Sequence, residues 1–423
     1  MKNLQNKTNY QIFQQISKFS NADIKRLLYN YSILIGGIFM KKIKKTLLLC
    51  LIIIMLTNTL VFADININEN IKGALLGDLE GEILYDYNIN QQLAIASISK
   101  LMTYTVMMDN VSAGEISLDD DVVISGHAAA TEGSNFGILA GETIKLRTLV
   151  EGMLIVSGND CATAVAEYVG ITQDNFVNMM NTKASELGLL SASFINPHGL
   201  PINDEETGQN YMSVSDLYKL VQHVLRTYPE ILEITKRPEL VITERNFSRA
   251  ATNPILGVME GADGLKTGYT DKAGICLVST MPVKGNGIDY RLIGIILGAQ
   301  THEDRINKTI ELLEYGKNNF IKLKLTDVSE AVDKVYISNS KSGKVNVYPA
   351  SEFNKIIKTQ DFVTTKITYN ETVKAPLSKG EKIGTISILV NGEEIGQVDA
   401  TVNENIEKAN ILVRIVRAFI NLF

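Results

Sequence analysis

Three short groups of residues with nucleophile, base and amide side chains occur in order along the chain. They are Ser97-Ile98-Ser99-Lys100, Ser157-Gly158-Asn159 and Lys266-Thr267-Gly268. A serine hydroxyl is a poor nucleophile until a neighbouring base takes its proton, and a neutral lysine one helical turn away can be that base. The first group therefore predicts covalent catalysis by Ser97 with Lys100 as the proton acceptor.

The sequence around Ser97 favours this interpretation over a chance match. Ser97 opens an apolar helix, so Lys100 faces a core, and burial depresses a lysine pKa. A second cation nearby has the same effect, and Lys266 is the natural candidate. The chain holds another S-x-x-K at Ser338-Asn339-Ser340-Lys341, but it lies in a polar, Gly-flanked turn, and we interpret it as a coincidence. For Lys100 alone, a solvated surface lysine is the alternative.

The other two groups predict substrate contacts. Ser157 and Asn159 lie between the apolar run 153–156 and the helix-favouring run 162–168, which indicates a helix joint. There the Ser157 hydroxyl can relay a proton to the leaving amine, and the Asn159 amide can hold a substrate peptide carbonyl. Lys266 and Thr267 can receive a substrate carboxylate, while Gly268 lets a peptide lie close to a strand edge. The alternatives are a plain helix cap and a β-turn.

With these groups, the chain from 97 to about 320 resembles the penicillin-binding transpeptidase-like family, specifically its D-alanyl-D-alanine carboxypeptidase branch, which includes the penicillin-binding protein 5 type. The resemblance also covers Asn196-Pro197-His198-Gly199-Leu200 and Asp263-Gly264-Leu265-Lys266-Thr267-Gly268-Tyr269-Thr270. It implies a catalytic domain of helices and a five-stranded sheet, and acylation of the serine by the penultimate D-Ala of a peptidoglycan stem peptide. The terminal D-Ala is then released, and water hydrolyses the ester. β-Lactam antibiotics are the implied covalent inhibitors, and no metal or cofactor is implied.

The resemblance also implies further site residues. The oxyanion hole would consist of the backbone N–H groups of Ser97 and Tyr269, and Arg305 would help to hold the substrate carboxylate. Ile95 departs from the family, in which proline commonly precedes Ala-Ser, and this affects the loop before the nucleophile but not the chemistry. We interpret His198 as structural.

Two other functions share parts of this pattern. A β-lactamase has the same three groups but needs fast deacylation, which class A enzymes achieve with a glutamate after S-x-N. No Glu-x-x-Leu-Asn sequence occurs between Asn159 and Lys266. A catalytically silent peptidoglycan-binding module is the second alternative, and intact Ser97 and Lys100 argue against it.

The periodicities predict an α+β protein with an antiparallel sheet flanked by helices, followed by a small all-β domain. Apolar spacing predicts helices over 97–110, 146–169, 173–187, 213–225 and 303–320, and an antiparallel strand pair over 275–280 and 290–297. After about 326, short alternating stretches such as 344–348 and 384–390 indicate strands. We therefore expect a catalytic domain over 64–325, a β-sandwich-like domain over 326–403 and a terminal helix over 404–423.

Composition and the N-terminus indicate export. A net charge of −6 gives no attraction to nucleic acid. Four lysines between 41 and 45 lead into the apolar run 46–62 and a small residue at Ala63, the layout of a secretory signal peptide over 40–63. We expect Met40 to be the working start and 1–39 an upstream misreading. The alternatives are a cytoplasmic extension and a permanent transmembrane helix. Cys161 and Cys276 are expected as buried free thiols, with a single disulfide as the alternative.

The C-terminal residues 405–423 indicate a membrane anchor. Glu407, Asn410, Arg414, Arg417 and Asn421 recur at intervals of three and four, which places them on one face of a helix. The residues around them are apolar apart from Lys408. The segment is short for a span, so we expect an amphipathic helix at the outer face of the cytoplasmic membrane, with a helix docked on the β domain as the alternative.

Overall fold

The computed structural model describes residues 65–202, 208–285 and 287–420. The expected signal peptide over 40–63, the residues before it and the last three residues of the chain lie outside the described residues. No helix within the described ranges is long and apolar enough to cross a membrane.

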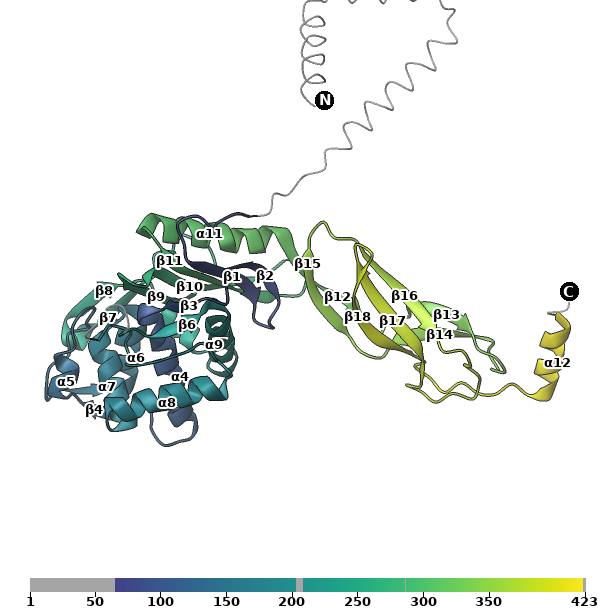
Figure 1. The fold of residues 1–423 in the computed structure, drawn as a ribbon. Helices are drawn as coiled ribbons and strands as arrows, with labels where there is room; N and C mark the ends of the chain where they lie inside the picture. The colour runs from purple at the N-terminus through teal and green to yellow at the C-terminus, as the bar shows by residue number, and fades with distance from the viewer. Residues whose placement is uncertain (1–64, 203–207, 286, 421–423) are drawn as a thin grey trace, which may run out of the picture. The chain divides into compact units, whose positions relative to one another are not determined.

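A five-stranded antiparallel sheet forms the centre of the first region (Figure 1). Its order is β2-β1-β11-β10-β9, with β1 at Gly73–Asp78, β2 at Ile83–Tyr87, β9 at Gly264–Thr270, β10 at Gly274–Val283 and β11 at Tyr290–Ala299. β10 and β11 pair antiparallel as expected. β9 carries Lys266-Thr267-Gly268 and pairs with β10 through Gly268 and Cys276.

Helices cover both faces of this sheet because its central strands alternate between two cores (Figure 1). Along β11, Leu292 and Ile296 pack with Leu312 and Leu313 of α11 (His302–Asn319). The intervening Ile293, Ile295 and Leu297 belong to the larger core on the other face. That core is completed by α4 (Lys100–Ser112), α6 (Leu146–Ile155), α7 (Asn159–Gly170), α8 (Gln173–Glu186) and α9 (Val214–Thr227).

Short elements connect these helices. They are β3 (Gln92–Ala94) paired with β6 (Tyr211–Ser213), β4 (Asp121–Val123) paired with β5 (Thr143–Lys145), and the hairpin of β7 (Glu239–Ile242) and β8 (Phe247–Ala250), together with η1 (Ala96–Ser99), η2 (Thr243–Arg245), α5 (Gly126–Ala129) and α10 (Ile231–Thr235). These pieces carry several of the contacts around the site.

The expected helix over 146–169 is wrong as a single element. The structure has two helices, α6 and α7, separated at 156–158. Ser157 lies between them with φ of 61°. A non-glycine residue in this left-handed region costs about 1 kcal/mol or more, and such strain is concentrated at functional sites. Because of this break, α7 begins at Asn159.

The second region consists of strands. β12 (Phe320–Thr326) pairs with β15 (Phe353–Lys358), and a five-stranded sheet has the order β13-β14-β18-β17-β16. Its bounds are β13 Asp333–Tyr336, β14 Lys344–Pro349, β16 Val363–Tyr369, β17 Lys382–Val390 and β18 Glu393–Thr401. A separate apolar core includes Val347, Ile386 and Val398. β12 therefore begins the strand region before the boundary expected at 326.

The terminal helix begins later than expected. α12 runs over Ile411–Ile420 and not from 405, because the residues before it pair with the β region. Ile406 exchanges backbone hydrogen bonds with Leu377, and Ala409 N donates to Asn339 O at 2.7 Å. Asn410 Oδ1 then accepts from Val413 N at 2.9 Å, which satisfies one of the orphan donors of the first turn.

Candidate active site

Ser97 lies in η1, directly before α4, with its side chain half-buried. Two glycines allow the backbone to approach it closely. A Cβ added to Gly199, whose φ is +91°, would lie 2.0 Å from Ala96 O. A Cβ added to Gly268 would lie 2.9 Å from Ile95 O and 3.2 Å from Ser97 N. Strand β9 and the loop containing Gly199 therefore pack directly against the turn that carries the serine.

Lys100 is fully buried and surrounded by oxygen atoms. Its Nζ lies 2.7 Å from Ser97 Oγ, 2.7 Å from Asn159 Oδ1 and 2.9 Å from His198 O. Burial lowers the pKa of Lys100 well below its usual range, and the charge of Lys266 lowers it further. These are the two causes that the sequence suggested. The ammonium is therefore destabilised, and the neutral amine is favoured.

Lys266 and Ser157 form a second buried pair. Lys266 Nζ donates to Ser157 Oγ and to Thr267 O, each at 2.9 Å. Burial lowers the pKa of Lys266 to about 7, with a further contribution from the positive charge of Arg305. The structure thus brings all three sequence groups together through lysines, because Lys100 contacts Asn159 and Lys266 contacts Ser157 of the same group.

The amide of Asn159 has defined partners at both ends. Its Oδ1 faces Lys100 Nζ, and its Nδ2 donates to Glu132 O at 2.8 Å. The backbone N–H of Asn159 donates to Ser134 O at 2.7 Å. Nδ2 carries a second hydrogen. The expected contact between Asn159 and a substrate carbonyl depends on this hydrogen.

The remaining expected residues lie on β9 and α11. Thr267 Oγ1 donates to Thr252 Oγ1 at 2.7 Å. Tyr269, whose OH donates to Asp271, is 57% exposed. Arg305 lies on α11 and is 8% exposed, and its Nε has no hydrogen-bond partner among the described residues. A buried guanidinium nitrogen without an acceptor is costly, and the fold bears that cost at Arg305.

Sequence reasoning missed two contributors. The carbonyl of His198 positions Lys100, although the imidazole itself is buried with its pKa lowered to about 3 by burial and by Lys100. Its Nδ1 accepts from Leu200 N at 3.1 Å, which fits the structural reading of this side chain. The second contributor is Asp160, whose buried carboxylate accepts backbone hydrogen bonds. Its position directly after Ser157-Gly158-Asn159 was the only sequence signal.

Both cysteines of this region are buried free thiols, as the sequence predicted. Cys161 follows Asp160 on α7, and burial raises its pKa well above the usual range. Cys276 lies on β10 beside Gly268, and burial raises its pKa to about 11. A raised pKa favours the protonated thiol, which is the less nucleophilic form.

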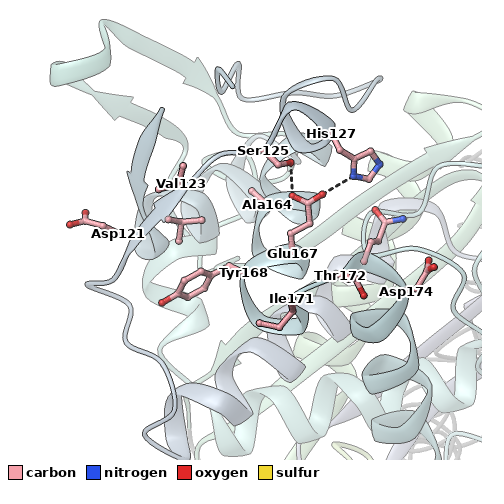
Figure 2. Close-up of a pocket in the computed structure, with 12 residues that line it drawn as sticks. Asp121, Val123, Ser125, His127, Ala164, Glu167, Tyr168, Ile171, Thr172 and Asp174 are labelled. Carbon is pink, nitrogen blue, oxygen red and sulfur yellow. Dashed lines mark hydrogen bonds and ion pairs between the residues drawn. The ribbon is translucent and has the colours of Figure 1, made fainter. Parts of the chain in front are cut away.

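A cavity of about 930 Å³ lies farther along α7, beside α5 and β4 (Figure 2). Figure 2 shows Glu167 turned toward Ser125 and His127, with Ser125 Oγ donating at 2.6 Å and His127 Nδ1 at 2.7 Å from the carboxylate. None of the residues expected from the sequence to bind substrate lines this cavity. The residues expected from the sequence to be catalytic lie around Ser97 instead.

A mixed α and β fold with a serine and a buried lysine one turn apart is typical of the penicillin-binding class of serine peptidases. The family model described as D-alanyl-D-alanine carboxypeptidase matches residues 70–301, more than half of the chain. A second model, described as the C-terminal domain of penicillin-binding protein 5, matches residues 320–408. The chain belongs to the D-alanyl-D-alanine carboxypeptidase family.

Individual relatives agree with this assignment. The chain is 31% identical to D-alanyl-D-alanine carboxypeptidase DacF of Bacillus subtilis, over 82% of this chain and 88% of the relative. The crystal structure of D-alanyl-D-alanine carboxypeptidase DacD from Francisella tularensis matches with 26% identity and a TM-score of 0.67, covering 83% of this chain and 98% of the other. Penicillin-binding protein D2 of Listeria monocytogenes in its cefotaxime-bound form matches with 31% identity and a TM-score of 0.54, covering 60% and 99%. These matches and the structure confirm the expected fold class.

Proposed function

We propose that the protein removes the terminal D-alanine from peptidoglycan stem pentapeptides through an acyl-enzyme on Ser97. Family membership supports the activity, and the arrangement around Ser97 supports the assignment of residues. Ser97 Oγ attacks the carbonyl carbon of the penultimate D-Ala, and the peptide C–N bond breaks. The terminal D-Ala leaves as a free amine. Water then hydrolyses the ester and returns the hydroxyl to Ser97.

The three contacts of Lys100 Nζ are the observation on which this assignment depends. A neutral amine has two N–H groups and one lone pair. Asn159 Oδ1 and His198 O can only accept hydrogen bonds, so they take both N–H groups. The lone pair is left facing Ser97 Oγ at 2.7 Å, where it accepts the hydroxyl proton. Because burial lowers the pKa of Lys100 well below its usual range, a larger fraction of the lysine is in this neutral form at a given pH.

The leaving amine needs a proton, and Ser157 is placed to supply one. Its hydroxyl contacts Lys266 Nζ at 2.9 Å, and a lysine with a pKa of about 7 can give up and regain a proton under working conditions. In this proposal Ser157 passes a proton to the departing nitrogen and receives one from Lys266, and the proton that Lys100 took from Ser97 is then passed on to Lys266, so that both lysines return to their starting states. The backbone N–H groups of Ser97 and Tyr269 stabilise the oxyanion, which the close approach of β9 to Ser97 N supports.

Recognition of the free substrate carboxylate is assigned to Lys266, Thr267 and Arg305, with Asn159 and Gly268 contacting the peptide. The positive charge of Arg305 acts on Lys266 and lowers its pKa, which supports the place of Arg305 in this set. The same residues would hold the carboxylate of a β-lactam, since the solved Listeria monocytogenes relative binds cefotaxime. We propose that β-lactams acylate Ser97 as covalent inhibitors.

Mass spectrometry after penicillin addition tests the proposal. We expect a persistent adduct on a peptide containing Ser97, together with D-Ala release from diacetyl-Lys-D-Ala-D-Ala. Ser97→Ala should lose both activities, while Ser338→Ala, which changes the other S-x-x-K, should keep both. Rapid turnover of the adduct would indicate a β-lactamase instead, and an absence of adduct would indicate a silent binding module.

We also propose that the enzyme is exported and held at the outer face of the cytoplasmic membrane by its C-terminal helix. Four apolar side chains of α12, those of Ile411, Leu412, Ile415 and Val416, are each more than half exposed. An amphipathic helix with an exposed apolar face is suited to the lipid interface. The signal-like sequence over 40–63 supports export.

Fractionation of two shortened chains tests the anchor. A chain that ends at Ala409 keeps the backbone pairing of 406 and 409 with the β region, so it should fold, be exported and remain soluble. The matched control is the full chain with Ile411→Ala, which removes one apolar contact and should stay on the membrane. Sedimentation of the shortened chain with membranes after signal cleavage would assign the anchor elsewhere.

A further inference from the structure

A buried carboxylate at the start of α7 gathers the backbone of the segment 132–139. Asp160 is 1% exposed, and its two oxygens accept from Phe136 N at 2.9 Å, Gly137 N at 2.7 Å and Ile138 N at 3.3 Å. Successive backbone N–H groups that converge in this way form an anion-binding concavity. Here the anion is a side chain of the same protein.

The gathered segment contacts the catalytic groups through Asn159. Its carbonyl at Glu132 accepts from Asn159 Nδ2 at 2.8 Å, and its carbonyl at Ser134 accepts from the Asn159 backbone at 2.7 Å. The first contact fixes which end of the amide faces Lys100, because Nδ2 is held at Glu132 and Oδ1 is left at Lys100 Nζ. A reversed amide would present N–H groups to the lysine and compete for its lone pair.

The opposite side of the segment is held by the β7–β8 hairpin. Arg245 Nη2 donates to Gly137 O at 3.0 Å, and the Arg245 guanidinium lies 5.0 Å from the ring centroid of Phe136. Arg249 Nη1 donates to Asn135 O. The segment is thus hydrogen-bonded to α7 by the N–H groups of 136–138 and the carbonyls of Glu132 and Ser134, and to the hairpin by the carbonyls of Asn135 and Gly137.

We propose that Asp160 is a positioning residue for acylation, which holds the segment 132–139 so that Asn159 directs the lone pair of Lys100 at Ser97. This inference rests on the proposed role of Lys100. A simple helix-capping role would involve only local donors, and Asp160 does accept from Cys161 N at 2.9 Å. The other donors, however, come from residues 22 to 24 positions earlier in the chain.

The charge of Asp160 gives the proposal a second signature. Three ionisable groups act on Lys100: Lys266 lowers its pKa, whereas Cys161 and Asp160 raise it. Removal of the Asp160 charge should therefore lower the pKa of Lys100 further. The acid limb of the acylation rate would then move to lower pH, even as the rate at the optimum falls.

Asp160→Asn in the full-length protein tests both signatures. Whichever way the new amide turns, its NH₂ group faces backbone N–H donors, so the segment loosens. We expect the second-order rate constant for penicillin acylation to fall by about tenfold or more, as small misplacements of catalytic groups cause. We expect the acid limb to shift downward as well.

Asp216→Asn is the matched control. Asp216 is also buried, and it holds a distant loop by accepting from Ser191 N at 2.8 Å and Ser191 Oγ at 2.6 Å. Its loss should reduce thermal stability but leave the acylation rate and the pH profile unchanged. If both variants altered the profile equally, Asp160 would have only a structural role.

Arg249→Ala keeps the proposal testable if Asp160→Asn fails to fold. Arg249 is exposed, and its removal frees the carbonyl of Asn135 on the other side of the segment. Acylation should fall in the same direction, by about two- to tenfold. Wild-type acylation in this variant, or in folded Asp160→Asn, would overturn the inference. Loss of labelling in Ser97→Ala, measured alongside, shows separately whether the proposed nucleophile is correct.

Discussion

Replacing Lys266 with methionine should stabilise the protein while it removes substrate recognition. Lys266 is 1% exposed, and its pKa falls from 10.5 to about 7 because of burial and the charge of Arg305. One pKa unit corresponds to about 1.4 kcal/mol, so keeping this lysine charged inside the fold costs about 5 kcal/mol at low pH. Methionine has a similar length and no charge. The substitution also leaves Ser157 Oγ and Thr267 O without their hydrogen-bond donor. Each lost hydrogen bond reduces the gain in stability by about 1 kcal/mol.

The pH dependence of this stability difference follows from the direction in which folding shifts the pKa of Lys266. A group with a depressed folded-state pKa contributes its full stability above its ordinary pKa, and that contribution is lost as the pH falls toward the folded-state value. For Lys266 this window runs from about 10.5 down to about 7. The variant should therefore exceed the wild type by about 3 kcal/mol at pH 6, and the difference should shrink by about 3 kcal/mol by pH 9.

Urea unfolding followed by far-ultraviolet circular dichroism measures this difference. The chain has no tryptophan, and within the described residues most helices lie between 96 and 319, so the helical signal reports the catalytic region. Lys341→Met is the control, since that side chain is 71% exposed and its ion pair with Glu407 lies at the surface. A difference between Lys266→Met and the wild type that did not change with pH would refute the reasoning.

Two further outcomes are expected at the site. Lys100→Arg should lower penicillin acylation about as much as Lys100→Ala, by about 10²- to 10⁴-fold, because a guanidinium cannot accept the proton of Ser97; near-normal acylation by the arginine variant, measured by stopped-flow, would require another base. Thr267→Ala should weaken cleavage of peptides with a free D-Ala carboxylate more than cleavage of their amidated analogues, because its hydroxyl is one of the groups assigned to the carboxylate. Equal losses on the two substrates, assayed side by side, would contradict that role.

Local sequence patterns were sufficient for much of the fold. The β10–β11 pair was predicted because its two apolar runs are joined by a short Gly-rich turn, so the pairing is local. The start of α9 was predicted to within one residue because Ser213 caps it, accepting from Asp216 N. Motif order predicted residues that lie around Ser97, because Lys100 and Asn159 begin helices and Lys266 lies on a strand.

Non-local contacts explain what the sequence could not predict. β1 pairs with β11 across most of the catalytic region, and no periodicity within either strand indicates its partner. The start of the helix predicted over 405–423 was placed too early because the competing interaction, the bridge of Ile406 to Leu377, involves a residue elsewhere in the chain. Asp160 was missed for the same reason. A carboxylate after a serine motif gives no sign of the N–H groups that it gathers from 136–138.

The two buried lysines show why the site departs from the rules that hold elsewhere in the fold. Lysine is almost never fully buried without an acidic partner, yet Lys100 and Lys266 are both buried among neutral oxygens. A carboxylate beside either Nζ would lower the cost of burial, but it would also raise the lysine pKa and keep the amine protonated. Catalysis requires the opposite. Carbonyl and hydroxyl oxygens orient the amine without fixing its charge, and Asp160, which carries a charge, directs its oxygens at backbone N–H groups instead. Burying two lysines in this way lowers the stability of the fold. The apolar cores on both faces of the sheet must therefore offset that loss.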